Sequence, residues 1–475
     1  MSKVQVDAIE QQCGTTLTVG GGACKTAVVD ATTVTLGRCG GTVSLASGAT
    51  QSGFGRTGTV DWQTTPKTAT FTAVNGEGYF CNTTSGGFEV DLPAGSAGAI
   101  VSVQDYNNTF DTGNLTIDPN GTEKINGGDA GMALTLSTEG QGLTLVYVDS
   151  TVGWRSVHSD DFSQVPENPA YITATVSGSC NTLTTSGDYK IATFVNPGTF
   201  CVSAIGNPSG SSAVDYMIVA GGAAGAGKNN GGGVGGGGAG GVRIGTVTQP
   251  SPLSPAGLIA PGKTVAVQGY PIVVGGGGAC STNVPNGTAG TSGGVSSGFC
   301  FTAAGGGGGN DATDNGAAGG SGGGAGESGG TAGAGNTPSV SPAQGNPGGD
   351  GNSPSQGGGG GGFTVAGESS APCATSPTGA GGAGINAGPV FGTANGSPPG
   401  YFAGGGGTTS GNPPAGPYPG GVGGGGQGNK AGVASTSGVA NTGGGGGGHG
   451  STGAPAGGTN GGGSGIVIIR YKFQN

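Results

Sequence analysis

Runs of glycine fill the second half of the chain and constrain its fold more than any other feature. They recur between residues 219 and 465, most plainly at 275–278, 305–309, 357–362, 404–407, 423–426 and 443–448. Freezing the backbone of one residue costs about 1–2 kcal/mol, and glycine lies at the costly end while bringing no side chain to bury. If this region is ordered, backbone hydrogen bonds must therefore supply the stabilisation that a side-chain core normally supplies.

Charge and framing favour order over disorder in this region. Glycine and proline account for 120 and 27 of the 475 residues, a content typical of low-complexity chains. However, only 8% of the residues are charged, whereas disordered segments are usually rich in charge. Apolar strands are also predicted on both sides of the glycine runs, over 214–220 and 466–471. A flexible linker would need no such frame.

An extended left-handed helix with three residues per turn suits this composition. Such a helix has no internal hydrogen bonds, so its N–H and C=O groups point outward to neighbouring helices. Net gains of roughly 0.5–1.5 kcal/mol per hydrogen bond then offset the entropy cost. A run of five or six residues spans roughly 15–19 Å. We therefore predict a bundle of packed polyglycine II helices with inserts emerging as loops at its two ends. A strict Gly-X-Y period is missing, which excludes collagen.

The rest of the chain predicts short strands, because helical periodicity is almost absent. The fold class is therefore all-β, with no α-helix of note. We divide the chain into an N-terminal attachment and oligomerisation region (1–58), a β-sandwich-like domain (59–158), a proline-containing linker (159–170) and the glycine-rich domain with its flanking strands (171–475). The second segment is read as a sandwich because its strands recur every 8–12 residues or so with turn signals between them.

Charge and cysteine usage exclude several classes of protein. A net charge of −10 speaks against a nucleic-acid-binding protein, which needs a basic surface. The N-terminus lacks the apolar segment of a signal peptide, and no run approaches the length of a membrane span. Nine cysteines without a CxxC pair, and two histidines, are poor material for a zinc site. We predict free or buried thiols; if Cys280, Cys300 or Cys373 pair at all, they join neighbouring loops.

Three patterns suggest chemistry that we do not expect. Residues 257–264 match the phosphate-binding loop GxxxxGK[ST], but a Thr/Val strand follows where that loop needs a helix. His449 follows six glycines and is predicted to be a solvated surface residue. Asp311, Asp314 and Glu327 do not have the spacing of a calcium-binding loop and are predicted to be polar loop residues. We therefore predict no catalytic residue, no cofactor and no metal, and no enzymatic activity.

The aromatic residues are the most distinctive side chains of the chain. Trp62 and Trp154 are predicted to lie in the core of the β domain. The inserts between glycine runs concentrate the candidate binding residues Phe301, Phe391, Tyr401, Phe402 and Tyr418. For Tyr401, Phe402 and Tyr418 two interpretations stay open, contact with a binding partner or packing against the glycine block.

The framing strands carry a resemblance to a known family. Residues 215–222 (Asp-Tyr-Met-Ile-Val-Ala-Gly-Gly) and 463–471 (Gly-Ser-Gly-Ile-Val-Ile-Ile-Arg-Tyr), with the lead-in 189–200, resemble the glycine-rich domain of tail fibres and tip adhesins of tailed bacteriophages, especially marine ones. The resemblance covers roughly 187–473; the stretches 1–7 and 142–157 are also similar to marine phage fibre proteins. It implies packed polyglycine helices whose exposed loops bind a bacterial surface receptor. No individual binding residue carries over.

Taken with the residues, this resemblance predicts a non-enzymatic virion fibre or adhesin. Its N-terminal part would dock to other virion tail proteins and oligomerise as a homotrimer, and its receptor would be an outer-membrane protein or a glycan. Two alternatives stay open. One is a purely structural virion component, such as a head fibre or a tail spacer. The other is an ice-binding protein, because polyglycine bundles can present flat faces.

Overall fold

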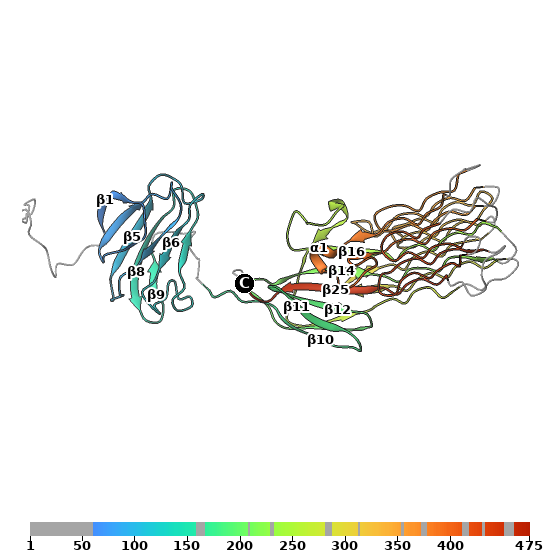
Figure 1. Cartoon of the computed structure of the whole chain (residues 1–475). Coiled ribbons are helices and arrows are strands. Elements are labelled where there is room, and N and C mark those ends of the chain that lie inside the picture. Colours follow the sequence, from blue (N-terminus) through green and yellow to red (C-terminus); the bar gives the residue numbers. More distant parts are fainter. Residues whose placement is uncertain are drawn as a thin grey trace, which may run out of the picture. The chain divides into compact units, whose positions relative to one another are not determined.

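The computed structural model describes two folded parts of the chain (Figure 1). The described residues are 60–157, 167–207, 210–228, 232–280, 287–311, 314–352, 356–371, 378–410, 418–429, 433–450 and 460–475. The predicted region 1–58 lies outside them, as does most of the predicted linker. Strands and extended glycine segments make up nearly all of the described chain, which confirms the all-β prediction.

The N-terminal domain is built from two β-sheets. One sheet has the order β1 (Asp61–Lys67), β3 (Glu77–Cys81), β5 (Ile100–Asp105), β8 (Gly142–Asp149) and β9 (Gly153–Ser156). The other has the order β2 (Phe71–Thr72), β4 (Phe88–Asp91), β6 (Leu115–Asp118) and β7 (Leu134–Leu136). β1, β3 and β5 pair in parallel, as do β2 and β4. The chain therefore alternates between the sheets like a solenoid, a winding that strand spacing alone does not reveal.

The two tryptophans of this domain have different environments. Trp154 is fully buried, and its indole Nε1 donates a hydrogen bond to Glu123 Oε2 at 2.9 Å, which confirms its core position. Trp62 is 41% exposed and packs against Phe80 in a tilted arrangement, with ring centroids 5.0 Å apart. The prediction for Trp62 is therefore wrong. Trp62 belongs to β1, which is the edge strand of this sheet among the residues that the structure describes.

A mixed sheet forms the base of the C-terminal domain. Its order is β11 (Thr182–Ser186), β12 (Tyr189–Phe194), β25 (Ile466–Lys472), β14 (Ala213–Val219), β16 (Val242–Thr246) and β17 (Ala260–Pro261), and β18 (Lys263–Thr264) also pairs with β14. The C-terminal strand β25 lies between β12 and β14, antiparallel to both. The two strands predicted to frame the glycine region are therefore direct neighbours, and the domain is closed by its last strand.

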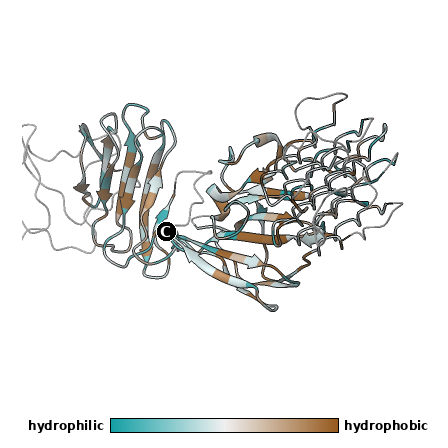
Figure 2. Cartoon of the chain, turned by 45° about the vertical axis from the view of Figure 1, so that its right-hand side comes forward, coloured by the Kyte–Doolittle hydropathy of each residue, from teal (hydrophilic) through white to brown (hydrophobic). Residues whose placement is uncertain are grey.

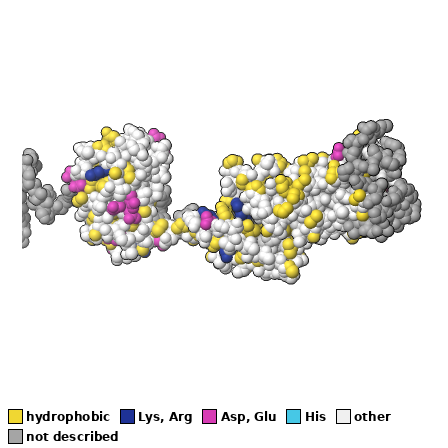
Figure 3. Space-filling model, viewed as in Figure 1, with side chains coloured by type: hydrophobic (Ala, Val, Ile, Leu, Met, Phe, Trp, Pro, Cys, Tyr) yellow, Lys and Arg dark blue, Asp and Glu magenta, His cyan; other side chains and the backbone are white. Residues whose placement is uncertain are grey.

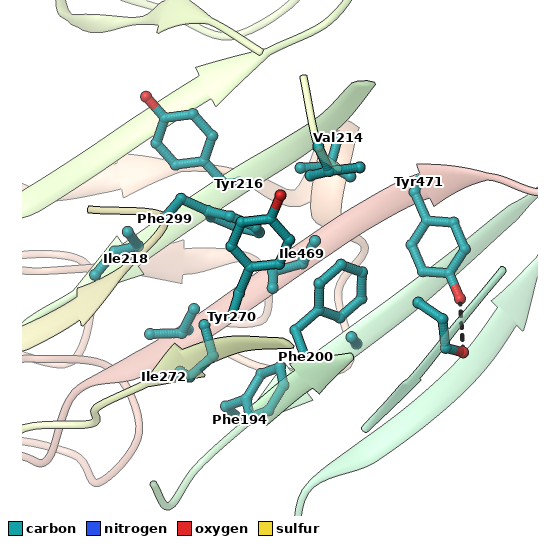
Figure 4. Packing of buried hydrophobic residues seen from close by; sticks show 14 of the residues in the cluster. Phe194, Phe200, Val214, Tyr216, Ile218, Tyr270, Ile272, Phe299, Ile469 and Tyr471 are labelled. Carbon is teal, nitrogen blue, oxygen red and sulfur yellow. Dashed lines mark hydrogen bonds between the residues drawn. The ribbon is translucent and has the colours of Figure 1, made fainter. Parts of the chain in front are cut away.

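Apolar clusters cover both faces of this base sheet. Alternation along β14 sends Tyr216 and Ile218 to one cluster and Met217 and Val219 to the other. Figure 4 shows the first cluster, where Phe200, Tyr270 and Ile272 from a three-stranded sheet pack on the base sheet. The strands of that smaller sheet are β10 (Thr173–Val176), β13 (Gly198–Ala204) and β19 (Gly269–Ile272). Figure 2 shows the hydrophobic residues concentrated on the strands.

Short elements complete the domain. The hairpin β20 (Ser296–Gly298) and β21 (Phe301–Ala303) packs with the first cluster, and the pair β22 (Ile385–Asn386) and β23 (Tyr401–Phe402) packs with the second. Between β22 and β23 lies the single described α-helix, α1 (Gly388–Phe391). The others are β15 (Gly227–Lys228), β24 (His449–Gly450) and the 3-10 helix η1 (Ala256–Leu258). No helix among the described residues is long and apolar enough to cross a membrane.

The glycine segments form hydrogen bonds with a period of three residues. In segment 221–227, successive backbone N–H groups donate to three different neighbouring segments in rotation, with N···O distances between 2.8 and 3.1 Å. The pairs are Gly221, Ala224 and Gly227 to Gly294, Thr291 and Thr288; Gly222 and Gly225 to Gly463 and Asn460; and Ala223 and Ala226 to Gly238 and Gly235. Three-residue periodicity with every bond between segments is the pattern of polyglycine II helices.

The carbonyl groups of the same segment extend the array. They accept N–H groups from three further segments: Gly306 and Gly309, Gly446 and His449, and Gly278. Segment 221–227 therefore has six hydrogen-bonded neighbours, three through its donors and three through its acceptors. Hydrogen bonds between backbones thus replace the side-chain core, as the sequence predicted.

Close approach of the backbones explains why glycine is required at the centre of this block. A Cβ atom placed on Gly237 would lie 2.2 Å from the carbonyl oxygen of Ala223, and one on Gly406 would lie 2.0 Å from that of Gly446. A carbon and an oxygen atom cannot lie so close together, so a side chain at either position would displace the neighbouring glycine helix. On the face that Figure 3 shows, few charged side chains lie on the described surface of the block.

Candidate functional site: the outer rim of the glycine block

Polar side chains gather at the end of the block that lies away from the base sheet. β14 ends at Val219, and segment 221–227 leads from it to Lys228, about 28 Å further at 3.1 Å per residue. Residues from distant parts of the chain meet there, and we call them the outer rim: Lys228, Asp311, Glu327, Thr408, Asn429, His449 and Asn460. Apart from Glu327, which is half-buried, all of them are buried.

Side chains of the rim satisfy backbone groups at the ends of the glycine segments. Thr408 Oγ1 donates to the carbonyl of Val234 at 2.9 Å, and Asn460 Nδ2 donates to that of Gly225 at 3.0 Å. The amide of Asn429 accepts the N–H of Gly450 at 2.8 Å and donates to the carbonyl of the same residue. Because a helix at the end of the array lacks neighbours for its last peptide groups, these side chains complete the hydrogen bonding.

One ion pair crosses the rim. Lys228 Nζ lies 2.9 Å from Glu327 Oε1, and Glu327 Oε2 accepts the N–H of Gly233 at 3.0 Å. Asp311 lies nearby and is buried, and desolvation raises the pKa of its carboxyl, with the negative charges of Asp314 and Glu327 adding to that effect. Asp311 and Glu327 lie outside helices and strands, as predicted for polar loop residues, but the end of the block buries Asp311 and half-buries Glu327.

The comparison with known protein families covers this block. The sequence model of the glycine-rich domain family matches residues 195–472, which is more than half of the chain. The chain belongs to the glycine-rich domain family. No curated protein shows significant similarity to it.

Within the glycine-rich domain, the five candidate aromatic residues do not form one surface. Phe391 and Phe402 are buried in the second apolar cluster, under the base sheet. Phe301 lies against the opposite cluster and stacks on Tyr216 with ring centroids 5.0 Å apart. Tyr401, half-buried, precedes Phe402 in β23, whereas Tyr418 is buried and its backbone pairs with Gly428. These positions favour packing over receptor contact, because aromatic rings are the largest apolar surfaces available in a glycine-rich chain.

The rim residues were not predicted as a site, although the sequence contains a signal for them. Thr408 directly follows the glycine run 404–407, His449 follows 443–448, and Asn460 directly precedes 461–463. A polar side chain at the end of a run is therefore the mark of a capping position. Reading these residues as hydrogen-bonding caps, and not as loop residues, would have located the rim.

The phosphate-loop match, the cysteines and a group of carboxylates give no further candidate site among the described residues. Residues 257–264 contain η1, β17 and β18, and no α-helix follows the match, so it is not a phosphate-binding loop. Cys280 and Cys300 are free thiols. Among the described residues, the carboxylates of Glu89, Asp91 and Asp118 lie within 4.8 Å of one another on the β domain. Proximity of carboxylates alone does not define a metal site.

His449 is buried, so the prediction of a solvated surface residue is wrong. Its backbone N–H donates to the carbonyl of Ala226, and its Nδ1 lies 2.8 Å from Ser435 Oγ. Segment 443–448 is one of the six neighbours of segment 221–227. Because His449 directly follows this segment, it lies within the array. Desolvation lowers the pKa of the imidazole below its usual 6.5.

This burial predicts a dependence of stability on pH. Because the imidazole pKa is lower in the folded than in the unfolded state, the unfolded state binds more protons, and stability is lost as the pH falls below about 6.5. We expect the melting temperature of the wild type to fall between pH 6.5 and 5 more than that of His449→Gln. Calorimetry of both proteins over this range measures the difference, and identical profiles would contradict the burial of His449.

Proposed function

We propose that the chain is a fibre or adhesin protein of a bacteriophage virion, and that the outer rim carries its host-recognition segments. Its receptor is a bacterial surface molecule, an outer-membrane protein or a glycan. The N-terminal part joins it to other virion tail proteins, and the assembled protein is a homotrimer. The proposal assigns no enzymatic activity, no cofactor and no nucleic acid to the chain.

The observation that carries this proposal is the convergence of chain segments at the rim. Described segments from distant parts of the chain meet there: Gly227 bridges to Thr288, Gln356 to Ser410, and Tyr418 to Gly428. A scaffold fixed by backbone bonds, with segments from many parts of the chain meeting at one end, is suited to presenting variable binding segments.

The test replaces inserts without touching the scaffold. Removal of 371–402 would also delete α1 and the buried Phe391 and Phe402, so a loss of binding would report unfolding. We therefore replace 372–377 and 411–417 by Gly-Ser segments of equal length and measure binding of the fluorescent full chain to bacteria that the wild type binds. We expect at least a tenfold loss of binding.

The control is Val267→Ser, which changes an exposed side chain on the strand-bearing part of the domain. It should bind cells like the wild type. Replacement of both inserts with unchanged cell binding and an unchanged melting temperature would refute recognition through the rim.

A further inference from the structure

A groove lies on the base sheet, far from the outer rim. Its volume is about 580 Å³, and it runs along β11 and β12 beneath the segment 392–395 that follows α1. α1 ends at Gly392, whose φ of +77° lets the chain turn back over the sheet. A Cβ on Gly392 would lie 3.9 Å from Ile191 Cδ1, so the segment rests directly on β12. The size falls within the range of roughly 300–1,000 Å³ that is usual for small-ligand sites.

One wall of the groove is a row of hydroxyl groups. Thr182, Thr184 and Ser186 alternate along β11, so all three side chains point to the same face of the sheet. β11 is the outermost strand of the sheet, and Thr182, Thr184 and Ser186 are exposed. Successive hydroxyls are about 7 Å apart, at two residues of roughly 3.4 Å each. Thr193, opposite Thr182 on β12, adds a fourth hydroxyl.

The facing wall and the floor complete this environment. Thr393 and Asn395 of the overhanging segment contribute a hydroxyl and an amide, whereas Ile191, Val195 and Phe391 form an apolar floor. Thr184 Oγ1 makes only a long bond, 3.4 Å, to the carbonyl of Ile191. The side chains of Thr182, Ser186 and Thr393 make no hydrogen bond to any residue that the structure describes. No lining residue is charged.

We infer that this groove binds a short neutral oligosaccharide. Hydroxyl and amide groups both donate and accept hydrogen bonds, which matches the hydroxyls of a sugar. The apolar floor suits the C–H face of a sugar ring, and the row of hydroxyls extends over more than one ring. Without a charged side chain, the groove offers no partner to a phosphate, a carboxylate or an ammonium group, whose desolvation would be left uncompensated. This site is separate from the recognition segments proposed at the rim.

The experiment titrates the full chain with maltotriose, cellotriose, triacetylchitotriose and the anionic trigalacturonate, using isothermal calorimetry. We expect saturable binding of at least one neutral trisaccharide and at least tenfold weaker binding of trigalacturonate. The variant Thr184→Val/Thr393→Val removes two hydroxyls at nearly constant shape, and we expect it to weaken the binding by about tenfold, because each lost hydrogen bond to the sugar lowers the affinity.

Thr185→Val is the matched control, because Thr185 lies on the same strand and points to the opposite face. It should bind the trisaccharide like the wild type. Absence of saturable binding by all three neutral sugars overturns the inference, as does an equal loss with Thr185→Val or equal affinity for trigalacturonate. Because the assay uses free sugars and leaves the rim inserts intact, its failure is distinguishable from failure of the proposed cell recognition.

Discussion

Replacing Gly237 with alanine is expected to lower the free energy of unfolding of the glycine-rich domain by about 3 kcal/mol, at the upper end of the usual cost of overpacking. The added Cβ would lie 2.2 Å from the carbonyl oxygen of Ala223 and 2.7 Å from that of Ala224. Both obstacles are backbone atoms, which cannot move aside as a flexible side chain does. Segment 221–227 would have to shift, and its bonds to six neighbours would weaken together.

Gly276→Ala is the matched control for this substitution. Gly276 belongs to the same block and accepts a hydrogen bond from the N–H of Gly294, but it is exposed, and an added Cβ would meet no atom within 4 Å. Here alanine restricts the unfolded chain without a clash, so stability should be unchanged or rise by about 0.4–1 kcal/mol. Urea unfolding of the two variants and the wild type measures both effects. Equal stabilities for Gly237→Ala and Gly276→Ala would contradict the packed array.

The architecture of the glycine region could be predicted because it follows from a general constraint. Glycine offers no side chain to bury, so an ordered glycine segment must form hydrogen bonds through its backbone to other segments. The apolar strands predicted over 214–220 and 466–471 indicated that the region between them is ordered. Which segments are neighbours could not be predicted. Segment 221–227 bonds to 288–294 and 460–463, and glycine runs carry no side-chain differences that would specify such pairs.

The functional residues were harder to predict for a related reason. Aromatic side chains such as Phe391 and Phe402 stand out in a glycine-rich sequence and were assigned to a receptor, but they supply the apolar cover of the base sheet. Polar residues at the ends of runs, such as Thr408 and Asn460, are inconspicuous in sequence and prove to be structural caps. The groove on β11 is lined by residues about 200 positions apart in the chain, so no local sequence pattern could predict it.

Breaking the ion pair of the base sheet is the second substitution with a large expected effect. Arg470 on β25 and Asp215 on β14 face each other across the sheet, with Nε and Oδ2 2.7 Å apart. The side chain of Asp215 is only 3% exposed, and it also accepts the N–H of Val247. Arg470→Leu would leave this carboxylate buried without its cation, which costs about 3–5 kcal/mol in comparable cases. We expect a loss of about 3 kcal/mol in unfolding free energy.

The double variant Asp215→Asn/Arg470→Leu separates the buried charge from the other contacts of Arg470. It removes the uncompensated charge and keeps an oxygen that accepts the N–H of Val247, so we expect its stability to lie within about 1–2 kcal/mol of the wild type. The remaining deficit would include the lost contact of the guanidinium with the ring of Tyr189, 4.3 Å from its centroid. An exposed ion pair contributes about 0–1 kcal/mol. If Arg470→Leu costs no more than that in urea unfolding, the pair does not hold β14 and β25 together, and hydrogen bonds and apolar packing alone close the domain.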